Sequence, residues 1–306
     1  MRGLENPKTA PRSLPICGRN QIILFRCLKQ YRKRFFAIHN PLTHYQEWAD
    51  FAQNIARDAG DIARKYFRNP DLGFERKGDN SPVTKADQEI ERFLRSKIQH
   101  TYPDHGIIGE EYAAVNQGAA VQWVIDPIDG TKPFIAGLPL FGILIGVYCD
   151  GVAVAGVLYQ PISNECWVGA KGGASFLNGN MVRCQNVRHE LGDAILCTSA
   201  PGLMAVAHSA AAFNRLKSQI YFTRYGMDCY ACGMVAIGSV DFMVETQLKL
   251  FDFAAFIAII ESAGGMISDW NGNALTLDCL TTTNPHGQML ISANPILHQK
   301  ALALLS

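Results

Sequence analysis

The chain has 306 residues, 48% of them hydrophobic and 18% charged, which is long enough to bury one large core or two smaller ones. Its formal net charge of +1 hides an asymmetry, because residues 1–40 hold nine Lys or Arg and one acid, while the remainder is acidic with a net charge near −7. No run of 18 apolar residues occurs, which argues against a helical membrane protein.

Nine cysteines are scattered from Cys17 to Cys279 without paired spacings, and no secretory leader is recognisable. We therefore expect a cytoplasmic chain in a reducing compartment. Cys229 and Cys232 form a single C-x-x-C pair, with no second pair and no histidine at ligand spacing, so we interpret both as packing residues rather than as a redox or zinc site.

Residues 1–43 form the first segment, which is rich in proline and basic residues and has little periodicity apart from a helical pattern around residues 22–36. Its composition faintly resembles a transit peptide, but we interpret it as a mobile extension or the product of an upstream start codon. Residues 44–306 are expected to form a single domain, with an N-terminal α+β half to about residue 185 and a C-terminal α/β half from about residue 186.

Two amphipathic helices are predicted at the start of this domain. Apolar residues recur at helical spacing from Trp48 to Tyr66. A second helix is expected to begin at the stretch PVTKAD, residues 82–87, where Thr84 and Asp87 have the spacing of a capping box, and to continue to Ile98. Asp87 therefore has a structural role available as an acid in the first turn of a helix.

Short apolar runs bounded by turn residues follow Pro103, and Asp150-Gly151 and Asn178-Gly179 are typical hairpin turns, so we expect an antiparallel sheet in the middle of the chain. Helical patterns return around residues 205–216 and 229–238, and again from Asp252 to a stop at Gly264-Gly265. Helices, then strands, then mixed elements predict a layered α and β structure without internal repeats.

Acidic residues stand at the ends of three predicted elements, as Glu110-Glu111, as Asp126 and Asp129 in DPIDGT, and as Asp252. Carboxylates held close together repel each other unless a cation lies between them, and an oxygen-only ligand set suits a hard cation such as magnesium. Gly130-Thr131 adds a turn and a hydroxyl that could hold a phosphate beside the metals. The pattern indicates a phosphoesterase centre that uses metal-activated water.

Simpler roles exist for some of these acids. Glu110-Glu111 could be a solvated loop and Asp252 a helix N-cap, whereas two acids crowded into DPIDGT favour a functional role. Their three-residue spacing argues against an aspartyl-phosphate route, which needs two aspartates two positions apart. The absence of a GxxxxGK[ST] loop and of GxGxxG between strand and helix argues against kinases and dinucleotide enzymes.

In order and spacing, GEE at residues 109–111, WVIDPIDGT at 123–131 and FDFAA at 251–255 resemble the inositol monophosphatase superfamily of lithium-sensitive magnesium phosphatases. The resemblance runs from about residue 46 to the C-terminus. Within the superfamily, stretches such as YPDHGIIGEEY and YGMDCYACGMVAIGSVDFMVE look most like the histidinol-phosphate phosphatases of this fold. Lys132-Pro133-Phe134 departs from inositol phosphatases, which more often continue DGT with Asn-Phe.

This resemblance implies an α+β chain folded as a five-layer αβαβα sandwich, with residues 44–306 as one phosphatase domain. It implies two or three Mg²⁺ per site, held by Glu110, Asp126, the Ile128 carbonyl, Asp129 and Asp252. Thr131, hydrogen-bonded to Asp87, would orient and deprotonate the attacking water, and Glu111 would support the water shell of the first metal. Ser81 stands where the family often has an acid in the loop before Asp87, which weakens the case for a third magnesium, and Phe251 stands where Trp is usual.

For the substrate, the resemblance implies contacts from Asp129, Gly130 and Thr131, with Asp228 and Glu245 facing its organic part. Asp228 could instead cap the helix that begins near Cys229. The expected reaction is hydrolysis of L-histidinol phosphate, with inositol monophosphate or another sugar or nucleotide phosphate as the alternative within the class. A non-catalytic metal- or phosphate-binding regulator is an alternative of a different class. The expected partners are a small phosphorylated metabolite and a second copy of the chain, with neither nucleic acid nor membrane.

Overall fold

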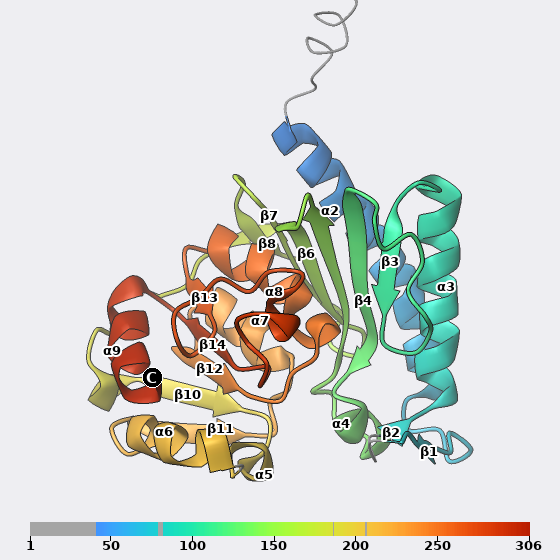
Figure 1. Ribbon diagram of the computed structural model, residues 1–306. Coiled ribbons are helices and arrows are strands. Elements are labelled where there is room, and N and C mark those ends of the chain that lie inside the picture. Colours follow the sequence, from blue (N-terminus) through green and yellow to red (C-terminus); the bar gives the residue numbers. More distant parts are fainter. Residues whose placement is uncertain (1–40, 79–81, 186, 206) are drawn as a thin grey trace, which may run out of the picture. The chain divides into compact units, whose positions relative to one another are not determined.

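A computed structural model describes residues 41–78, 82–185, 187–205 and 207–306, and Leu42–Ser306 form one compact unit of the chain (Figure 1). Most of the basic extension expected over residues 1–43 lies outside the described residues, as does Ser81. Within the described residues, no helix combines the length and the apolar composition needed to cross a bilayer.

A seven-stranded sheet forms the larger part of this unit, with strands in the order β3-β4-β5-β6-β7-β8-β9. All neighbours are antiparallel except β3 and β4. The expected turns lie where the sequence places them, with φ of 49° and 78° at Asp150-Gly151 and 49° and 81° at Asn178-Gly179. The strands span Gly106–Gly109, Val121–Asp129, Gly142–Cys149, Val152–Gln160, Glu165–Ala170, Ser175–Leu177 and Asn180–Val182.

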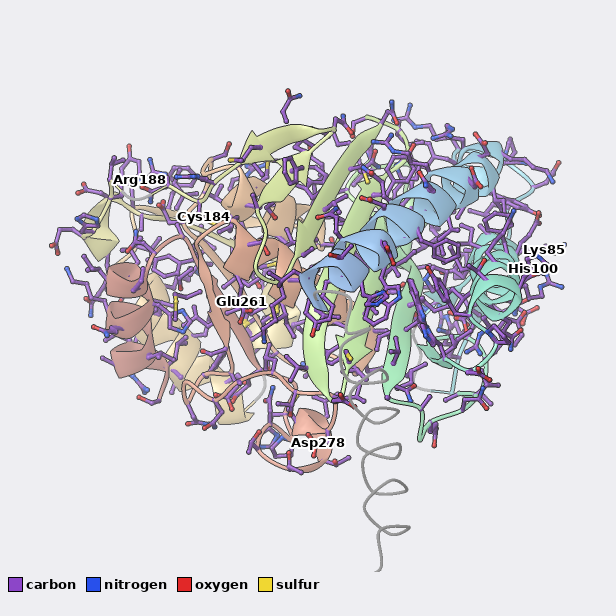
Figure 2. The ribbon with its side chains drawn as sticks, turned by 90° about the horizontal axis from the view of Figure 1, so that it is seen from above. Lys85, His100, Cys184, Arg188, Glu261 and Asp278 are labelled. Carbon is purple, nitrogen blue, oxygen red and sulfur yellow. The ribbon has the colours of Figure 1, made fainter. Side chains whose placement is uncertain are left out.

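Two helices, α2 (Pro41–Tyr66) and α3 (Lys85–Thr101), cover one face of this sheet. Seen from above, α2 runs across the strands, and α3 is seen nearly along its axis, so Lys85 and His100 from its two ends appear close together in this view (Figure 2). Because side chains alternate along a strand, Trp123 of β4 packs toward these helices while Val124 packs against the opposite layer. The periodicity from Trp48 onward identified α2, but the helix begins seven residues earlier, at Pro41.

The opposite face packs against α7 (Tyr230–Ala236) and α8 (Leu250–Ser262), which separate it from the second sheet. A Cβ on Gly146, Gly156 or Gly169, which lie on three adjacent strands, would overlap the backbone of α8. The missing side chains let α8 lie close to the sheet, which brings its first turn to the ends of the strands. The predicted start at Asp252 falls two residues inside the helix.

The second sheet has five strands in the order β11-β10-β12-β14-β13, and α6 (Ala207–Lys217) and α9 (Pro295–Leu305) cover its far side. The five layers confirm the αβαβα sandwich expected from the sequence. The helix predicted over residues 205–216 corresponds to α6, and a separate single turn, α5 (Pro201–Met204), precedes it. The strands β10 to β14 span Ile195–Thr198, Phe222–Tyr225, Phe242–Glu245, Met266–Ser268 and Met289–Ser292.

The remaining elements are short. The strands β1 and β2 form a small antiparallel pair next to the first turn of α3. A single turn of helix, α4, follows β4 directly and begins at Thr131. Their bounds are Glu75–Arg76 for β1, Pro82–Val83 for β2 and Thr131–Ile135 for α4, and two 3-10 turns span Leu191–Asp193 and Cys279–Thr281.

His298 of α9 gives a pH-dependent prediction for the stability of the second sheet. Its ring lies 2.9 Å from Ser268 Oγ and 3.0 Å from Ser292 Oγ, and burial lowers its pKa to about 4. The unfolded chain, with an ordinary histidine pKa, therefore takes up the proton first as the pH falls below about 6.5. We expect His298 alone to lower the free energy of unfolding by about 2 kcal/mol between pH 7 and pH 5.

Denaturant unfolding of wild type and His298→Gln over this pH range measures the effect, because all other titrating groups are shared and cancel in the difference. The wild type should lose more stability than the variant on acidification. Parallel pH profiles for the two proteins would contradict a buried neutral His298.

Candidate metal centre and active site

The acidic residues expected to act together meet at one cleft of about 560 Å³, formed where β4, α4 and the first turn of α8 come together. This cleft is also lined by Lys132 and by residues of the second half of the chain, among them Ser199. Of the residues predicted from the sequence, those that line it are Glu110, Asp126, Ile128, Asp129, Gly130, Thr131, Asp228 and Asp252.

Asp126, Asp129 and Asp252 form the centre of the site, since one carboxylate oxygen from each lies within 4.8 Å of the others. In a regular strand, residues three apart face opposite sides, so Asp126 and Asp129 could not both point into one site. The pairing of β4 with β5 shifts register between these two residues, around Pro127, and the irregularity turns both carboxylates to the same side.

Four aspartates at the site, Asp87, Asp126, Asp129 and Asp252, are each tethered by a backbone N–H that donates to one of the carboxylate oxygens. The donors and distances are Thr84 to Asp87 at 2.8 Å, Ile128 to Asp126 at 3.0 Å, Cys229 to Asp129 at 2.9 Å and Lys249 to Asp252 at 2.8 Å. A tether of this kind orients the carboxylate and leaves its second oxygen for another partner. The helix-cap role that the sequence allowed for Asp252 is therefore compatible with a ligand role.

Burial raises the pKa of the clustered carboxylates, and repulsion among them adds to the effect. The pKa values of Asp126 and Asp129 are raised well above the ordinary value, and that of Asp252 is raised to about 7. A divalent cation would relieve this repulsion. Because the converging groups are carboxylate and carbonyl oxygens, they fit a hard cation such as magnesium better than zinc or copper.

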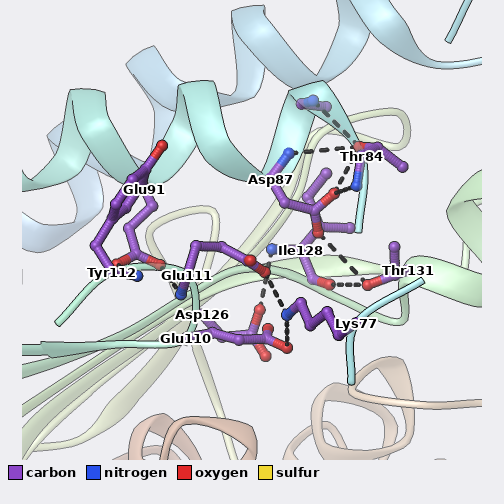
Figure 3. Close-up of polar contacts among 11 residues, drawn as sticks. Lys77, Thr84, Asp87, Glu91, Glu110, Glu111, Tyr112, Asp126, Ile128 and Thr131 are labelled. Carbon is purple, nitrogen blue, oxygen red and sulfur yellow. Dashed lines mark hydrogen bonds and ion pairs between the residues drawn. The ribbon is translucent and has the colours of Figure 1, made fainter. Parts of the chain in front are cut away.

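Glu110 and Glu111 share the ammonium group of Lys77, which lies 2.7 Å from Glu110 Oε1 and 2.6 Å from Glu111 Oε1 (Figure 3). Glu110 raises the pKa values of both Asp126 and Asp252 and so belongs to the same charge cluster. Burial raises the pKa of Glu111 to about 7. Lys77 was not anticipated from the sequence, because a lysine in a loop has no spacing that connects it with acids more than 30 positions away.

Thr131 stands at the start of α4, and its hydroxyl lies 3.5 Å from Asp87 Oδ1 and 3.2 Å from the Ile128 carbonyl (Figure 3). A hydroxyl has one hydrogen to donate, so it selects between these two acceptors. Burial raises the pKa of Asp87 to about 6. The structure therefore brings together the Thr131–Asp87 pair that the resemblance implies, although these residues are 44 positions apart.

Asp228 lines the cleft from the second half of the chain, and within the described residues no hydrogen bond reaches its carboxylate. Burial raises its pKa to about 6. It does not cap α7, which begins with Cys229 as its N-cap and has no side-chain cap hydrogen bond. With φ at 45°, Asp228 adopts a left-handed conformation that Asp and Asn tolerate better than most residues.

Glu245 lies deeper than Asp228 and does not line the cleft. Its carboxylate accepts the backbone N–H and the hydroxyl of Ser199 at 2.6 and 2.9 Å, and Ser199 is the residue that reaches the cleft. Burial raises the pKa of Glu245 to about 8. The structure therefore places Ser199, which the sequence analysis did not single out, in front of Glu245.

A sequence profile described as the inositol monophosphatase family matches residues 44–306. The chain belongs to this family. An inositol monophosphatase from Zymomonas mobilis has a solved structure that resembles this one with a TM-score of 0.75 and 36% identity, covering 85% of this chain and 98% of that one. The match to the inositol monophosphatase family includes every candidate residue described above.

Two curated relatives are named as phosphatases. The chloroplastic bifunctional phosphatase IMPL2 of Arabidopsis thaliana is 36% identical over 266 residues, which cover 86% of this chain and 76% of the relative. A histidinol-phosphatase of Chlorobaculum parvum is 31% identical over 254 residues, covering 83% of this chain and 95% of the relative. A relative from Pasteurella multocida, 36% identical over 229 residues that cover 73% of this chain and 85% of the relative, carries the name Nus factor SuhB.

Proposed function

We propose that this member of a phosphatase family hydrolyses L-histidinol phosphate to L-histidinol and phosphate in a magnesium-dependent reaction. The observation that carries the choice of substrate is the Asp228 carboxylate, which lines the cleft without a hydrogen-bond partner among the described residues. Asp228 is partly buried, and although Lys132 lies close enough to offset part of the resulting rise in its pKa, the carboxylate has no hydrogen-bond donor among these residues. The ammonium or imidazole group of histidinol phosphate would supply that donor together with a second positive charge. The name of the C. parvum relative, a histidinol-phosphatase, agrees with this choice.

Magnesium would be held by Glu110, Asp126, the Ile128 carbonyl, Asp129 and Asp252, whose oxygen donors suit it. When bound, it supplies positive charge for the phosphate oxygens and lowers the pKa of an attacking water. The backbone tethers engage one oxygen of Asp126, Asp129 and Asp252 and leave the other for a metal ion, so the carboxylates are already oriented before binding.

Thr131 and Asp87 would act on the attacking water. With the Ile128 carbonyl engaged elsewhere, the Thr131 hydroxyl donates its hydrogen bond to Asp87 Oδ1. As the attacking water gives a proton to Thr131 Oγ, the proton that the hydroxyl already carries passes to Asp87, which is the final acceptor. Asp87 remains fixed by its bond to the Thr84 N–H, so the proton acceptor is held in place by the same helix cap that starts α3. A proton acceptor with a pKa near neutrality suits this role.

Asp228→Asn tests the substrate assignment, because Asn tolerates φ at 45° and removes only the charge. A lost charge-assisted contact with substrate costs about 1.5–3 kcal/mol, so kcat/KM for histidinol phosphate should fall by roughly ten- to a hundredfold. The same constant for inositol monophosphate should change little, since a neutral polyol has no cation to offer Asp228. Phosphate release by both proteins on both substrates is the measurement.

Two outcomes would overturn the assignment. The first is an equal loss on both substrates, which would make Asp228 a structural residue. The second is a wild-type preference for inositol monophosphate, which is the alternative that the Zymomonas mobilis neighbour favours. If wild type releases no phosphate from any member of a panel of phosphomonoesters, the chain is instead a binding protein that has kept the fold.

A further inference from the structure

Two charged residues on α3 hold the loop that carries Glu110 and Glu111, although neither lines the cleft. Glu91 and Arg95 follow Asp87 at intervals of four residues, so all three lie along one side of the helix. Their side chains are buried, with 0% of Glu91 and 10% of Arg95 exposed, and they form an ion pair of 2.7 Å. The helix therefore has two buried sides: an apolar one formed by Ile90, Leu94 and Ile98, and beside it a charged one formed by Asp87, Glu91 and Arg95.

The Glu91 carboxylate is connected to the main chain of the loop through both of its oxygens. Its Oε2 accepts the Glu111 N–H at 2.7 Å, and its Oε1 accepts the Tyr112 N–H at 3.2 Å as well as Arg95 Nε. Figure 3 shows Glu91 beside the backbone of Glu111 and Tyr112. These bonds hold the backbone, so they fix where the Glu111 and Glu110 side chains begin rather than contacting those side chains.

Arg95 binds carbonyl groups of the same loop, and together with Glu91 it forms what we call the side-chain clamp on residues 111–113. Its guanidinium donates to the Tyr112 carbonyl at 2.8 Å and to the Ala113 carbonyl at 3.1 Å, and lies over the Tyr112 ring at 5.9 Å. The pair Glu91–Arg95 therefore engages both N–H groups and carbonyls of residues 111–113, a segment without helix or strand structure of its own.

On the other side of Glu110, Gly109 is the last residue of β3 and pairs with Ile125 of β4. A Cβ on Gly109 would overlap the Glu91 carboxylate, so the glycine is what allows Glu91 to reach the loop. Glu110 is thus held between a strand pairing and a side-chain clamp. Without the clamp, one of these two restraints on Glu110 would be lost.

We infer that Glu91 and Arg95 are positioning residues that set the affinity of the site for magnesium by fixing the backbone that carries Glu110 and Glu111. This inference rests on the proposed metal-dependent function. Neither residue touches substrate or the reacting atoms, so both act through the loop. A purely structural ion pair would instead affect the stability of the fold and leave metal affinity unchanged.

Glu91→Gln is the informative variant, because glutamine has nearly the same shape and keeps one acceptor oxygen but loses the charge that holds Arg95. A substitution by alanine would leave the buried Arg95 beside an empty space and would lower the stability of the fold more. Arg95→Lys is the second variant, since it keeps the positive charge but removes the forked contacts to the two carbonyls. Both should remain folded at 25 °C.

Asp241→Asn is the matched control. Asp241 is likewise fully buried, accepts the Ile195 N–H at 2.8 Å and pairs with Arg188 Nε at 3.0 Å, but it belongs to the second half of the chain and does not line the cleft. It should lower the unfolding temperature in the same way as the α3 variants without changing the response to magnesium.

The measurements are calorimetric titration of each protein with Mg²⁺ in the absence of substrate, and phosphate release as a function of Mg²⁺ concentration. We expect both Glu91→Gln and Arg95→Lys to raise the magnesium dissociation constant about tenfold or more, in the range seen when partners behind metal ligands are removed. In the activity measurement, the Mg²⁺ concentration that gives half of the maximal rate should rise, while the maximal rate at saturating Mg²⁺ should change less.

Each other outcome is decisive. If the α3 variants lose stability as Asp241→Asn does but bind Mg²⁺ as tightly as wild type, Glu91 and Arg95 have a structural role alone and the inference is wrong. If wild type binds Mg²⁺ and releases no phosphate, the proposed function fails while the titrations still decide the positioning role. If wild type binds no Mg²⁺, both proposals fail.

Discussion

Asp126→Asn is expected to lower the rate of phosphate release by two or more orders of magnitude, which is about the loss that accompanies removal of a metal's charge stabilisation. Asn keeps the oxygen that accepts the Ile128 N–H, so the local fold should persist. The lost negative charge lies at the centre of the cluster, within 4.8 Å of Asp129 and Asp252. Asp252→Asn should behave similarly, because it removes a carboxylate from the same cluster.

The same substitution should have the opposite effect on stability in the presence of a chelator. Burial and repulsion raise the pKa of Asp126, so the tendency of this group to ionise destabilises the metal-free fold at neutral pH, and this cost declines as the pH falls from the raised pKa toward the ordinary one. Metal-free Asp126→Asn should therefore have a higher Tm than metal-free wild type at pH 7. Added Mg²⁺ should raise the Tm of wild type more than that of the variant.

Thermal unfolding with and without Mg²⁺, alongside phosphate release, checks both parts. Full activity of wild type in excess chelator would contradict the metal-dependent mechanism. A metal-free variant less stable than wild type would show that the hydrogen bonds of Asp126 outweigh the repulsion around it.

Thr131→Val is expected to reduce the rate at saturating substrate and Mg²⁺ by about 10²–10⁴-fold, the usual contribution of general acid–base catalysis. Valine has nearly the shape of threonine but cannot donate to Asp87 Oδ1 or accept a proton from water. Thr131→Ser keeps the hydroxyl and should retain most of the rate.

The Mg²⁺-induced rise in Tm distinguishes this role from metal binding. Thr131→Val should show the same rise as wild type, because none of the metal-binding carboxylates is altered. If the rise disappears, Thr131 supports the ligands rather than the water. If Thr131→Val and Thr131→Ser lose the same activity, the hydroxyl is not the group that matters.

The parts of the fold that could be predicted are those where one physical signal repeats along the chain. Helical spacing of apolar residues identified α2, and the Asp150-Gly151 and Asn178-Gly179 turns identified an antiparallel sheet. The parallel pairing of β3 with β4 could not be foreseen, because it depends on where two segments meet and no local pattern encodes it.

In the site, the acids were recognisable because crowded charge is costly wherever it occurs, and the resemblance supplied the pairing of Thr131 with Asp87. The register shift between Asp126 and Asp129 was not predictable from their spacing, which in a regular strand would separate them. Lys77, Glu91 and Arg95 were missed for another reason. They contact residues far away in sequence, and two of them act mainly on backbone, which carries no side-chain pattern to search for.

Asp87 and Asp252 have a consequence for reading divergent relatives. Each is the third residue of its helix and accepts an N–H from the residue that precedes the helix, so selection for a folded chain alone would keep an acid at both positions. A descendant that had abandoned catalysis could therefore retain both for a long time. Thr131 and Glu110 receive no such protection, since neither caps a helix through its side chain. In a relative that has lost catalysis, Thr131 and Glu110 should therefore be replaced earlier than Asp87 and Asp252. The presence of the two helix-starting acids alone is no sign that a relative is an active enzyme.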